Sequence, residues 1–414
     1  MTHATLTSEI EIWLLEEAVR DPDIQKLFST LCARLHGIGV PVERAALTWP
    51  TLHPLFEAEQ IYWRLGEESQ LRQYPHETAR NAAWEQSPFR HIIVNRLPRL
   101  RRRLTGDERM VDFPVLVDLE ADGFTDYLLV AEGLSIGDVR SYDGADMGVM
   151  ASWATRREGG FSASDIEALT RIQRVFSVAV HSSIQSRIQR NLASVYLGET
   201  AAQRVLSGTI QRGDGEVIRA VVWYSDLRGS TRLSNTMDAK DYLKLLRCYY
   251  DCTAQPVIDE GGEILEFIGD AVLAIFPIRG DTGGPEAIRA AVRAMRKSLQ
   301  MREAKLAEHE ALGLPEELRF SVSMTVGEMM FGNIGVPDRL TFSAIGRAVN
   351  KVARIDEMSK RLGRMVLVTR EIAQVEPERW ISAGVQQLRD FDEPVELMTC
   401  ACGTDMHEPV AAAG

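Results

Sequence analysis

The sequence predicts an α+β protein in which one long helix joins two globular domains. Its 414 residues are enough for two domains, and strand-like and helical stretches alternate in both halves. A helical repeat without internal Gly or Pro separates the halves. The second half has the order β-α-β-β-α-β of a ferredoxin-like sheet. The expected parts are a first domain at 1–161, a linking helix at 162–204, a second domain at 205–402 and a tail at 403–414.

Composition narrows the classes of function. The chain is 45% hydrophobic and 26% charged, which is typical of a globular protein. Its net charge of -12 argues against a nucleic-acid partner. No apolar run is long enough for a membrane span, and the N-terminus lacks a signal-peptide pattern, so we expect a cytoplasmic protein. Five cysteines are too few for a disulfide framework, and we expect reduced packing thiols.

In the first half, the sequence predicts two helices followed by strands, the order of an α+β sensor fold with an antiparallel sheet. The helices are expected at 8–20 and 22–36, and the strands at 43–49, 56–65, 126–134 and 148–154. A basic cluster is interpreted as a solvated loop or helix face: Arg96, Arg99, Arg101, Arg102 and Arg103. An aromatic-rich stretch forms either core or the lining of a ligand cavity: His53, Phe56, Tyr62 and Trp63.

The linking helix has a clear start. Ser162 is a plausible N-cap, with Asp165 near the positive end of the helix dipole. Apolar residues then recur every three or four positions: Ile166, Leu169, Ile172, Phe176, Val180, Ile184, Ile188 and Leu192. This length favours a helix paired between domains, and the alternative is a helix packed on its own domain.

The second half contains the elements of the ferredoxin-like order. They are a strand at 216–225, a helix at 239–260, strands at 263–268 and 271–276, a helix at 285–309 and a strand at 319–335. Gly269-Asp270 forms a two-residue hairpin turn between the middle strands. We expect an antiparallel sheet with both helices on one face.

Two aspartates are expected to meet at one end of this sheet. Asp226 ends the first strand, and Asp270 lies in the hairpin tip. Two converging like charges are costly unless cations compensate them, and a pair of divalent metals suits phosphoryl chemistry. The turn after the first strand suits a phosphate at a helix start: Arg228, Gly229, Ser230 and Thr231.

A third group of residues lies in "RLTFSAIGRAVNKVARID" (339–356). Asn350 and Arg354 are four residues apart and share a helix face. Arg354 can bind a phosphate, and Asn350 can orient a sugar. Taken alone, the segment is better explained as an ordinary amphipathic helix with Val349, Val352 and Ile355 facing inward.

Together these segments resemble the catalytic domain of the class III adenylate and guanylate cyclases. "YSDLRGST" resembles the first metal motif of the family, "EFIGDAVLAIF" the second, and "SAIGRAVNKVAR" the transition-state helix. The resemblance covers about residues 205–400. It implies that Asp226, Asp270 and the carbonyl of Leu227 bind two Mg²⁺ or Mn²⁺ ions. The implied reaction converts a purine nucleoside triphosphate to its 3′,5′-cyclic monophosphate and pyrophosphate.

The resemblance also implies a homodimer, because in the family the residues matching Asn350 and Arg354 come from the opposite protomer. A further phosphate contact is offered by Arg389, although Asp390 replaces the glycine usually found next. Ser230 stands where the family commonly has Phe.

The residues that select the base leave ATP and GTP both open. Adenylate cyclases carry a Lys where this chain has Glu266, and guanylate cyclases carry Glu there. A carboxylate accepts from the N1–H and amino group of guanine, which favours GTP. Ser343, the partner position, can donate or accept and does not decide. Relatives with this domain order are more often regarded as adenylate cyclases, which favours ATP.

The first half is similar in architecture to a GAF-type sensor, which implies regulation by a small-molecule or protein signal. One alternative function is a catalytically weak cyclase-like module that binds nucleotide. A diguanylate cyclase is disfavoured, because the nearest string to its Gly-Gly-(Asp/Glu)-Glu-Phe turn is "GGPEAI" (283–288), which lies on a linker.

Overall fold

The computed structural model describes residues 3–76, 82–133, 148–211, 213–280, 283–308, 318–336 and 338–400. The chain divides into two compact units, Met1–Tyr196 and Leu197–Gly414. Each unit has its own hydrophobic cores. Within the described ranges, no helix is both long and apolar enough to cross a bilayer.

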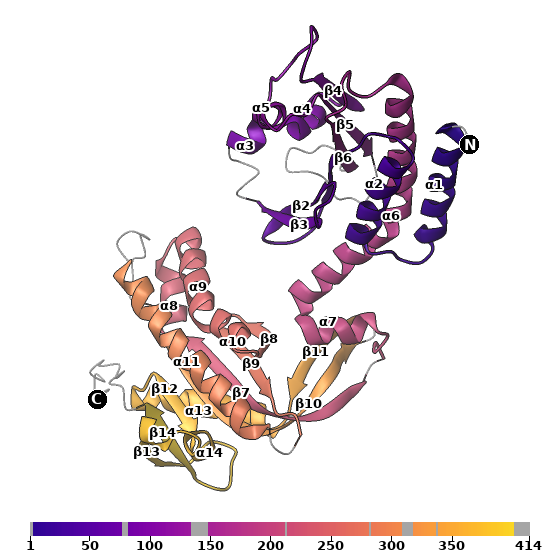
Figure 1. Cartoon of the computed structure of the whole chain (residues 1–414). Helices are drawn as coiled ribbons and strands as arrows, with labels where there is room; N and C mark the ends of the chain where they lie inside the picture. Colours follow the sequence, from indigo (N-terminus) through magenta and orange to yellow (C-terminus); the bar gives the residue numbers. More distant parts are fainter. Residues whose placement is uncertain are drawn as a thin grey trace. The chain divides into compact units, whose positions relative to one another are not determined.

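The N-terminal unit is built on a six-stranded antiparallel sheet in the order β3-β2-β1-β6-β5-β4 (Figure 1). Its strands are β1 (Arg44–Pro50), β2 (Phe56–Arg64), β3 (Gln70–Pro75), β4 (Arg99–Arg103), β5 (Asp126–Gly133) and β6 (Gly148–Thr155). Its helices are α1 (His3–Ala18), α2 (Ile24–Gly37), α3 (Ala82–Glu85), α4 (Pro88–Val94), α5 (Pro114–Ala121) and α6 (Ala163–Leu197). Helices α1, α2 and α6 pack on one face of the sheet, and α4 and α5 pack on the other.

The α+β order predicted for the first half is confirmed, with both helices and all four strands close to their expected ranges. Two strands, β3 and β4, and three short helices, α3, α4 and α5, were missed. The basic cluster was expected on a loop or helix, and most of it forms β4 instead, so that its arginines alternate between the two faces of the sheet. Among the aromatic residues, Trp63 is a buried core residue.

Helix α6 begins as the sequence predicts. The Ser162 hydroxyl accepts a hydrogen bond from the Asp165 N–H (3.2 Å), and Asp165 accepts one from the Ser162 N–H (2.8 Å). The helix packs on its own unit, which was the alternative arrangement. Most of its periodic apolar residues lie in the N-terminal core: Leu169, Ile172, Phe176, Val180, Ile184 and Ile188.

The C-terminal unit contains an eight-stranded sheet in the order β13-β14-β12-β10-β7-β9-β8, with β11 paired to β10. Its strands are β7 (Gly215–Leu227), β8 (Glu263–Ile268), β9 (Ala271–Pro277), β10 (Phe320–Val336), β11 (Arg339–Ile345), β12 (Val366–Thr369), β13 (Trp380–Gln386) and β14 (Val395–Cys400). Its helices are α7 (Glu199–Leu206), α8 (Ser230–Thr236), α9 (Ala239–Thr253), α10 (Gln255–Asp259), α11 (Gly284–Ala307), α13 (Arg347–Leu362) and α14 (Arg370–Ala373), with a short 3₁₀ turn, η2 (Pro377–Arg379).

The predicted β-α-β-β-α-β order is confirmed. Helices α9, α10 and α11 cover one face of the sheet, as expected (Figure 1). The single helix predicted for 239–260 is two helices, because Pro256 cannot continue the hydrogen-bond ladder of α9. The opposite face, for which no cover was predicted, is packed against α7 and α13.

Alternation along β7 decides where its last residues point. Val221 and Trp223 pack toward α9 and α11, whereas Ala220 and Val222 pack toward α13. Asp226 follows the second series and therefore points to the α13 face. Gly327 on β10 allows α13 to approach closely, because a Cβ there would lie 2.6 Å from the Cβ of Ala348.

The cysteine prediction is confirmed for three residues and wrong for one. Cys32, Cys248 and Cys252 are free thiols, and burial raises the pKa of Cys252 to about 12. Cys400 is disulfide-bonded. Cys400 is the last described residue. Cys402 and the predicted tail at 403–414 lie outside the described residues. Sequence spacing alone did not reveal this bond.

Candidate active site

The strand pairing brings Asp226 and Asp270 to the same end of the sheet. Strand β7 lies antiparallel to β9, with Asp226 opposite Ala271, the residue that follows Asp270. The Leu227 N–H donates a hydrogen bond to the main-chain carbonyl of Asp270 (3.0 Å). This main-chain bond fixes the hairpin tip beside the end of β7.

Asp226 is almost fully buried among charged groups. Its side chain is 9% exposed and contacts the ammonium of Lys360 on α13. Burial raises the pKa of Asp226 to about 6, the Lys360 hydrogen bond lowers it, and the charges of Asp356 and Asp270 raise it. The protein therefore holds this carboxylate at a cost that its own cations offset only in part.

Asp356 is the second buried carboxylate on this face. Lys360 lies 3.6 Å from its Oδ2 atom, and Arg228 lies 3.7 Å from its Oδ1 atom. The Ser321 hydroxyl also donates to it. Asp356 and Lys360 are four residues apart on α13, so they share the helix face that packs on β7. Neither residue was predicted to belong to the site, although their i,i+4 spacing beside Asn350 and Arg354 was a signal in the sequence.

The side chain of Arg228 lies against α13. Its guanidinium donates to the Ser359 hydroxyl (2.6 Å) and faces Asp356, and burial lowers the pKa of Arg228. The phosphate role predicted for Arg228 therefore requires either its main chain or a movement of this side chain.

The turn after β7 has the backbone that the sequence predicted. Gly229 adopts a left-handed conformation (φ 71°, ψ 15°) at the start of α8. Ser230 and Thr231 are the first residues of that helix, where main-chain N–H groups lack partners within the helix. The turn therefore offers donors beside the two aspartates.

Asn350 and Arg354 lie on a different face of α13. Asn350 lies six residues before Asp356, and Arg354 lies six residues before Lys360. Arg354 is also two residues from Asp356, which is a rotation of about 200° around the helix. Arg354 donates to Glu357 (2.5 Å) and Asp390 (3.1 Å). The structure therefore does not bring these two residues to the Asp226 of the same chain.

Arg389 lies in this second group. Its guanidinium is 3.5 Å from Glu357 and 3.5 Å from Asp390, the two acids that also hold Arg354. The arginines are thus kept side by side by shared carboxylates. Asp390, the departure noted in the sequence, has a positive φ of 65° and binds both of them.

Glu266 and Ser343, the two residues predicted to select the base, meet in the structure. The Ser343 hydroxyl on β11 donates to Oε2 of Glu266 on β8 (3.3 Å). They are 77 residues apart in the chain. The Glu266 carboxylate, which accepts hydrogen bonds, therefore lies beside the Ser343 hydroxyl, which can donate or accept.

The donor chemistry of the first group fits divalent metal ions. Carboxylate and carbonyl oxygens are the ligands that Mg²⁺ prefers, and Mg²⁺ commonly uses only one or two carboxylates beside waters and substrate phosphates. Within the described residues, no group of three or more His, Cys, Asp or Glu side chains is placed to hold a metal. A metal here would therefore depend on Asp226, Asp270, main-chain oxygen and substrate.

Comparison with known proteins finds similarity in this part of the chain. Residues 216–382 match the sequence profile described as the adenylate and guanylate cyclase catalytic domain. A curated adenylate cyclase of Anabaena cylindrica is 26% identical over 221 residues, 51% of this chain and 42% of that protein. An uncharacterized protein of Mycobacterium tuberculosis is 28% identical over 244 residues, 58% of this chain and 41% of that protein. This chain thus spans less than half the length of these relatives.

Solved structures of both kinds of cyclase are similar to the chain. The adenylyl cyclase CyaB from P. aeruginosa aligns with a TM-score of 0.40 and 22% identity, covering 49% of this chain and 100% of that chain. The guanylyl cyclase Cya2 aligns with a TM-score of 0.39 and 24% identity, covering 48% of this chain and 97% of that chain.

Metal binding should weaken in acid. A proton and a metal compete for Asp226, so below its pKa of about 6 the affinity for Mn²⁺ should fall about tenfold per pH unit. Titration of Mn²⁺ by electron paramagnetic resonance across this range measures the effect. Affinity that stays constant through pH 6 would contradict it.

Lys360→Met should strengthen metal binding at a pH well above the pKa of Asp226, because the variant removes a cation that competes for the carboxylate. We expect about fivefold tighter Mn²⁺ binding, the equivalent of ~1 kcal/mol for a half-exposed ion pair. The same change should raise the pKa of Asp226 and move the acid loss of binding to higher pH.

Lys244→Met is the matched control, because Lys244 forms a comparable exposed ion pair with Asp241 (2.8 Å) on α9. Calorimetric titration of both variants with Mn²⁺ compares them directly. Equal affinities in Lys360→Met and the unaltered protein would show that the ion pair does not oppose the metal.

Proposed function

We propose that this chain converts a purine nucleoside triphosphate to its 3′,5′-cyclic monophosphate and pyrophosphate, because residues 216–382 match the adenylate and guanylate cyclase catalytic domain. The observation that carries the proposal is the convergence of Asp226 and Asp270 beside a turn with free main-chain donors. Class III cyclases use divalent metals, and the donor set here suits two Mg²⁺ or Mn²⁺ ions.

Asp226, Asp270 and the Leu227 carbonyl would hold these ions. When bound, the metals supply Lewis-acid chemistry, lowering the pKa of the ribose 3′-hydroxyl and neutralising charge on the α-phosphate. Asp226 must release Lys360 to serve as a ligand. The lysine is half-exposed on a flexible stem, so this exchange requires only a side-chain movement.

Other residues of the chain position the substrate. The turn at Gly229, Ser230 and Thr231 would direct main-chain N–H groups at the phosphates. Asn350 would orient the ribose, and Arg354 would stabilise charge that develops on the α-phosphate. Arg389, held beside Arg354, would add a second cation for the phosphates.

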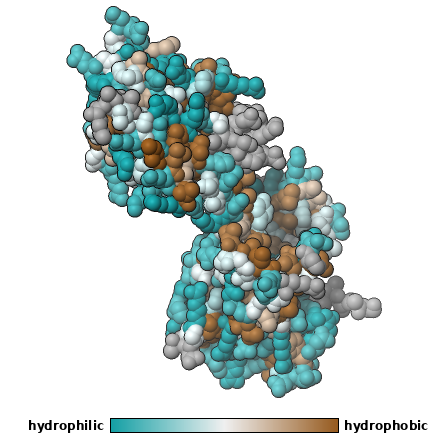
Figure 2. All heavy atoms as spheres, turned by 90° about the vertical axis from the view of Figure 1, so that its right-hand side faces the viewer, coloured by the Kyte–Doolittle hydropathy of each residue, from teal (hydrophilic) through white to brown (hydrophobic). Residues whose placement is uncertain are grey.

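The proposal includes a homodimer, which the two faces of α13 support. One face directs Lys360 to Asp226 of its own chain. Asn350 and Arg354 lie on the other face and would act on the aspartates of a second copy. Exposed apolar residues near the base-selecting pair support such contact: Phe267, Ile268 and Ile345. Figure 2 shows brown apolar side chains gathered on the visible face of the C-terminal unit.

For the base, the chemistry of Glu266 supports GTP. Its carboxylate accepts from two donors of guanine, while the Ser343 hydroxyl holds it in place. Both named kinds of cyclase are among the similar proteins, so the comparisons favour neither base. Regulation by the N-terminal unit, with its GAF-like architecture, is part of the same proposal.

The direct test is the product formed from ATP or GTP with Mn²⁺ by the full chain, measured by chromatography. We expect a cyclic nucleotide, and we expect Asp226→Asn to lose at least about 100-fold in rate because a metal ligand is removed. Nucleotide binding without product would instead favour the alternative, a catalytically weak binding module.

Mixing two inactive variants should restore activity if the site is shared between copies. Asp226→Asn removes the proposed metal ligand, and Arg354→Ala removes the proposed contact to the α-phosphate. Half of the dimers in an equal mixture are mixed and each keeps one intact site, so about a quarter of the original rate should return. A mixture as inactive as its components, with dimers exchanging, would contradict the shared site.

Glu266→Lys should reverse the preference between bases. An ammonium only donates hydrogen bonds and would face the donors of guanine, so the rate with GTP should fall about 100-fold relative to that with ATP. Glu263→Lys on the same strand is the control. A ratio that is unchanged in Glu266→Lys would show that this residue does not contact the base.

A further inference from the structure

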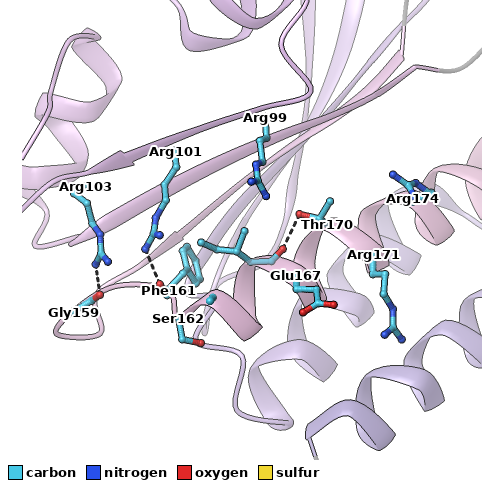
Figure 3. A pocket seen from close by; sticks show the side chains of 12 residues that line it. Arg99, Arg101, Arg103, Gly159, Phe161, Ser162, Glu167, Thr170, Arg171 and Arg174 are labelled. Carbon is cyan, nitrogen blue, oxygen red and sulfur yellow. Dashed lines mark hydrogen bonds between the residues drawn. The ribbon is translucent and has the colours of Figure 1, made fainter. Parts of the chain in front are cut away.

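A groove in the N-terminal unit has five arginines among its lining residues (Figure 3). It lies between the edge strand β4 and the first turns of α6, and its volume is about 730 Å³. Small-molecule sites commonly have this size. Five arginines and one acid, Glu167, are among its described lining residues: Arg99, Arg101, Arg103, Arg171 and Arg174.

The strand side of the groove is where core residues would be expected. Arg99 pairs with Val130 on β5, and Arg101 pairs with Leu128, so each arginine shares a sheet face with its partner. Leu128 and Val130 belong to the core beneath α6. On this face of the sheet, the edge strand β4 carries Arg99 and Arg101 where an apolar residue would fill the space beneath α6. This space is the groove.

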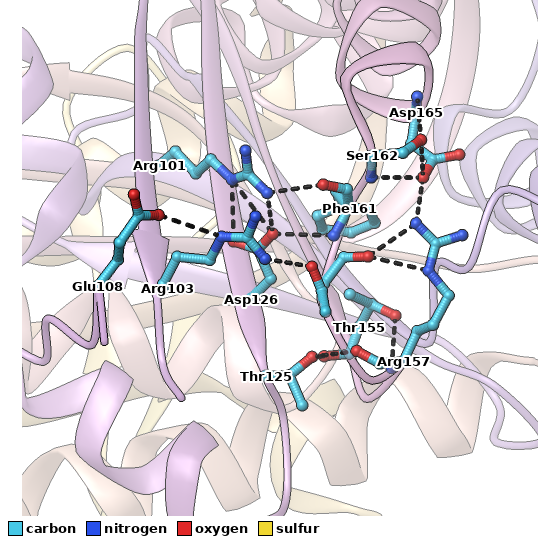
Figure 4. Close-up of polar contacts among 12 residues, drawn as sticks. Arg101, Arg103, Glu108, Thr125, Asp126, Thr155, Arg157, Phe161, Ser162 and Asp165 are labelled. Carbon is cyan, nitrogen blue, oxygen red and sulfur yellow. Dashed lines mark hydrogen bonds and ion pairs between the residues drawn. The ribbon is translucent and has the colours of Figure 1, made fainter. Parts of the chain in front are cut away.

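The position of Arg101 is fixed by buried groups (Figure 4). Its guanidinium donates to both carboxylate oxygens of the fully buried Asp126 and to the Phe161 carbonyl (2.6 Å). Asp126 also accepts from the Phe161 N–H (2.9 Å). Gly160 makes this fit possible, because a Cβ there would lie 2.5 Å from Oδ2 of Asp126.

Other cations of the groove remain accessible. Arg99 is exposed and has no partner within the described parts of the chain. Arg174 is 70% exposed and lies 3.5 Å from Glu132. Arg171 pairs with Glu11 yet is 47% exposed. One rigid guanidinium and three accessible ones therefore surround the same space, which also receives the positive end of the 35-residue helix α6.

We infer that this groove binds a phosphate-bearing small molecule. Guanidinium groups recognise phosphate oxygens in pairs. A phosphate here would bridge β4 and α6, and would exchange with the peripheral carboxylates Glu11 and Glu132. This site belongs to the N-terminal unit and does not depend on the cyclase reaction.

The competing explanation is protection of the edge strand, since charged residues on an edge strand discourage pairing with other chains. Protection requires no ligand and no particular geometry. The rigid placement of Arg101 through Asp126 and Gly160 is instead what a preformed anion site needs. Binding decides between the two explanations.

The test is calorimetric titration of the full chain with inorganic triphosphate in EDTA, where metal-dependent binding at the catalytic unit is suppressed. We expect Arg99→Glu and Arg174→Glu each to weaken binding by about tenfold or more, because each reverses a charged contact. The control is Arg190→Glu, an exposed arginine further along α6, which should bind normally.

Three outcomes would overturn the inference: no binding by the unaltered chain, equal loss in all three variants, or loss only in Arg389→Ala, which would place the anion on the catalytic unit. Sedimentation with phosphatidylcholine vesicles, with and without phosphatidic acid, identifies the source of the phosphate. Capture by the acidic vesicles that Arg99→Glu abolishes would support the site and assign it to a lipid headgroup.

Discussion

The C-terminal unit depends on the burial of one carboxylate at the end of a central strand. Asp226 is placed by the pairing of β7 with β9, and the same pairing brings the hairpin tip and Asp270 beside it. Burial raises its pKa most, and the neighbouring acids raise it further, so the arrangement costs free energy chiefly through loss of solvation. Lys360 and Arg228 offset part of that cost.

Helix α13 connects this carboxylate to the rest of the proposed site. Its inner face carries Asp356 and Lys360 against β7, and its outer face carries Asn350 and Arg354. The side chains of a helix keep fixed angular positions around its axis. When Lys360 faces Asp226, Asn350 and Arg354 therefore face away from it. The absence of a side chain at Gly327 lets α13 pack closely on β10 in this orientation. The same packing therefore keeps Asn350 and Arg354 away from the Asp226 of their own chain, and the proposed shared site rests on this separation.

Buried acids organise the N-terminal unit in a comparable way. Asp126 joins Arg101 on β4 to the main chain at Phe161, immediately before α6 begins. Ser162 and Asp165 then cap the helix reciprocally. The groove, the edge strand and the start of α6 are thus one connected polar network. A ligand in the groove would contact this network at the first turn of α6, where hydrogen bonds hold the start of the helix.

The sequence by itself determined the β-α-β-β-α-β order of the C-terminal unit and the main strands and first two helices of the N-terminal unit, because alternation of apolar residues, the Gly269-Asp270 turn and the glycines after helices are local signals. It also identified Asp226, Asp270, Glu266 and Ser343 as candidates, since their spacing follows recognisable motifs. Their roles stay predictions, but the structure brings each pair together.

Only the tertiary structure decided which side chains meet across long separations. The Lys360 contact with Asp226, the position of Arg228 against α13 and the shared acids of Arg354 and Arg389 depend on how α13 rotates on the sheet. Likewise, "RLRRR" reads as a solvated run until β4 pairs with β5 and turns alternate arginines toward α6. Local sequence carries periodicity, but the partner facing each residue is set by packing between distant segments.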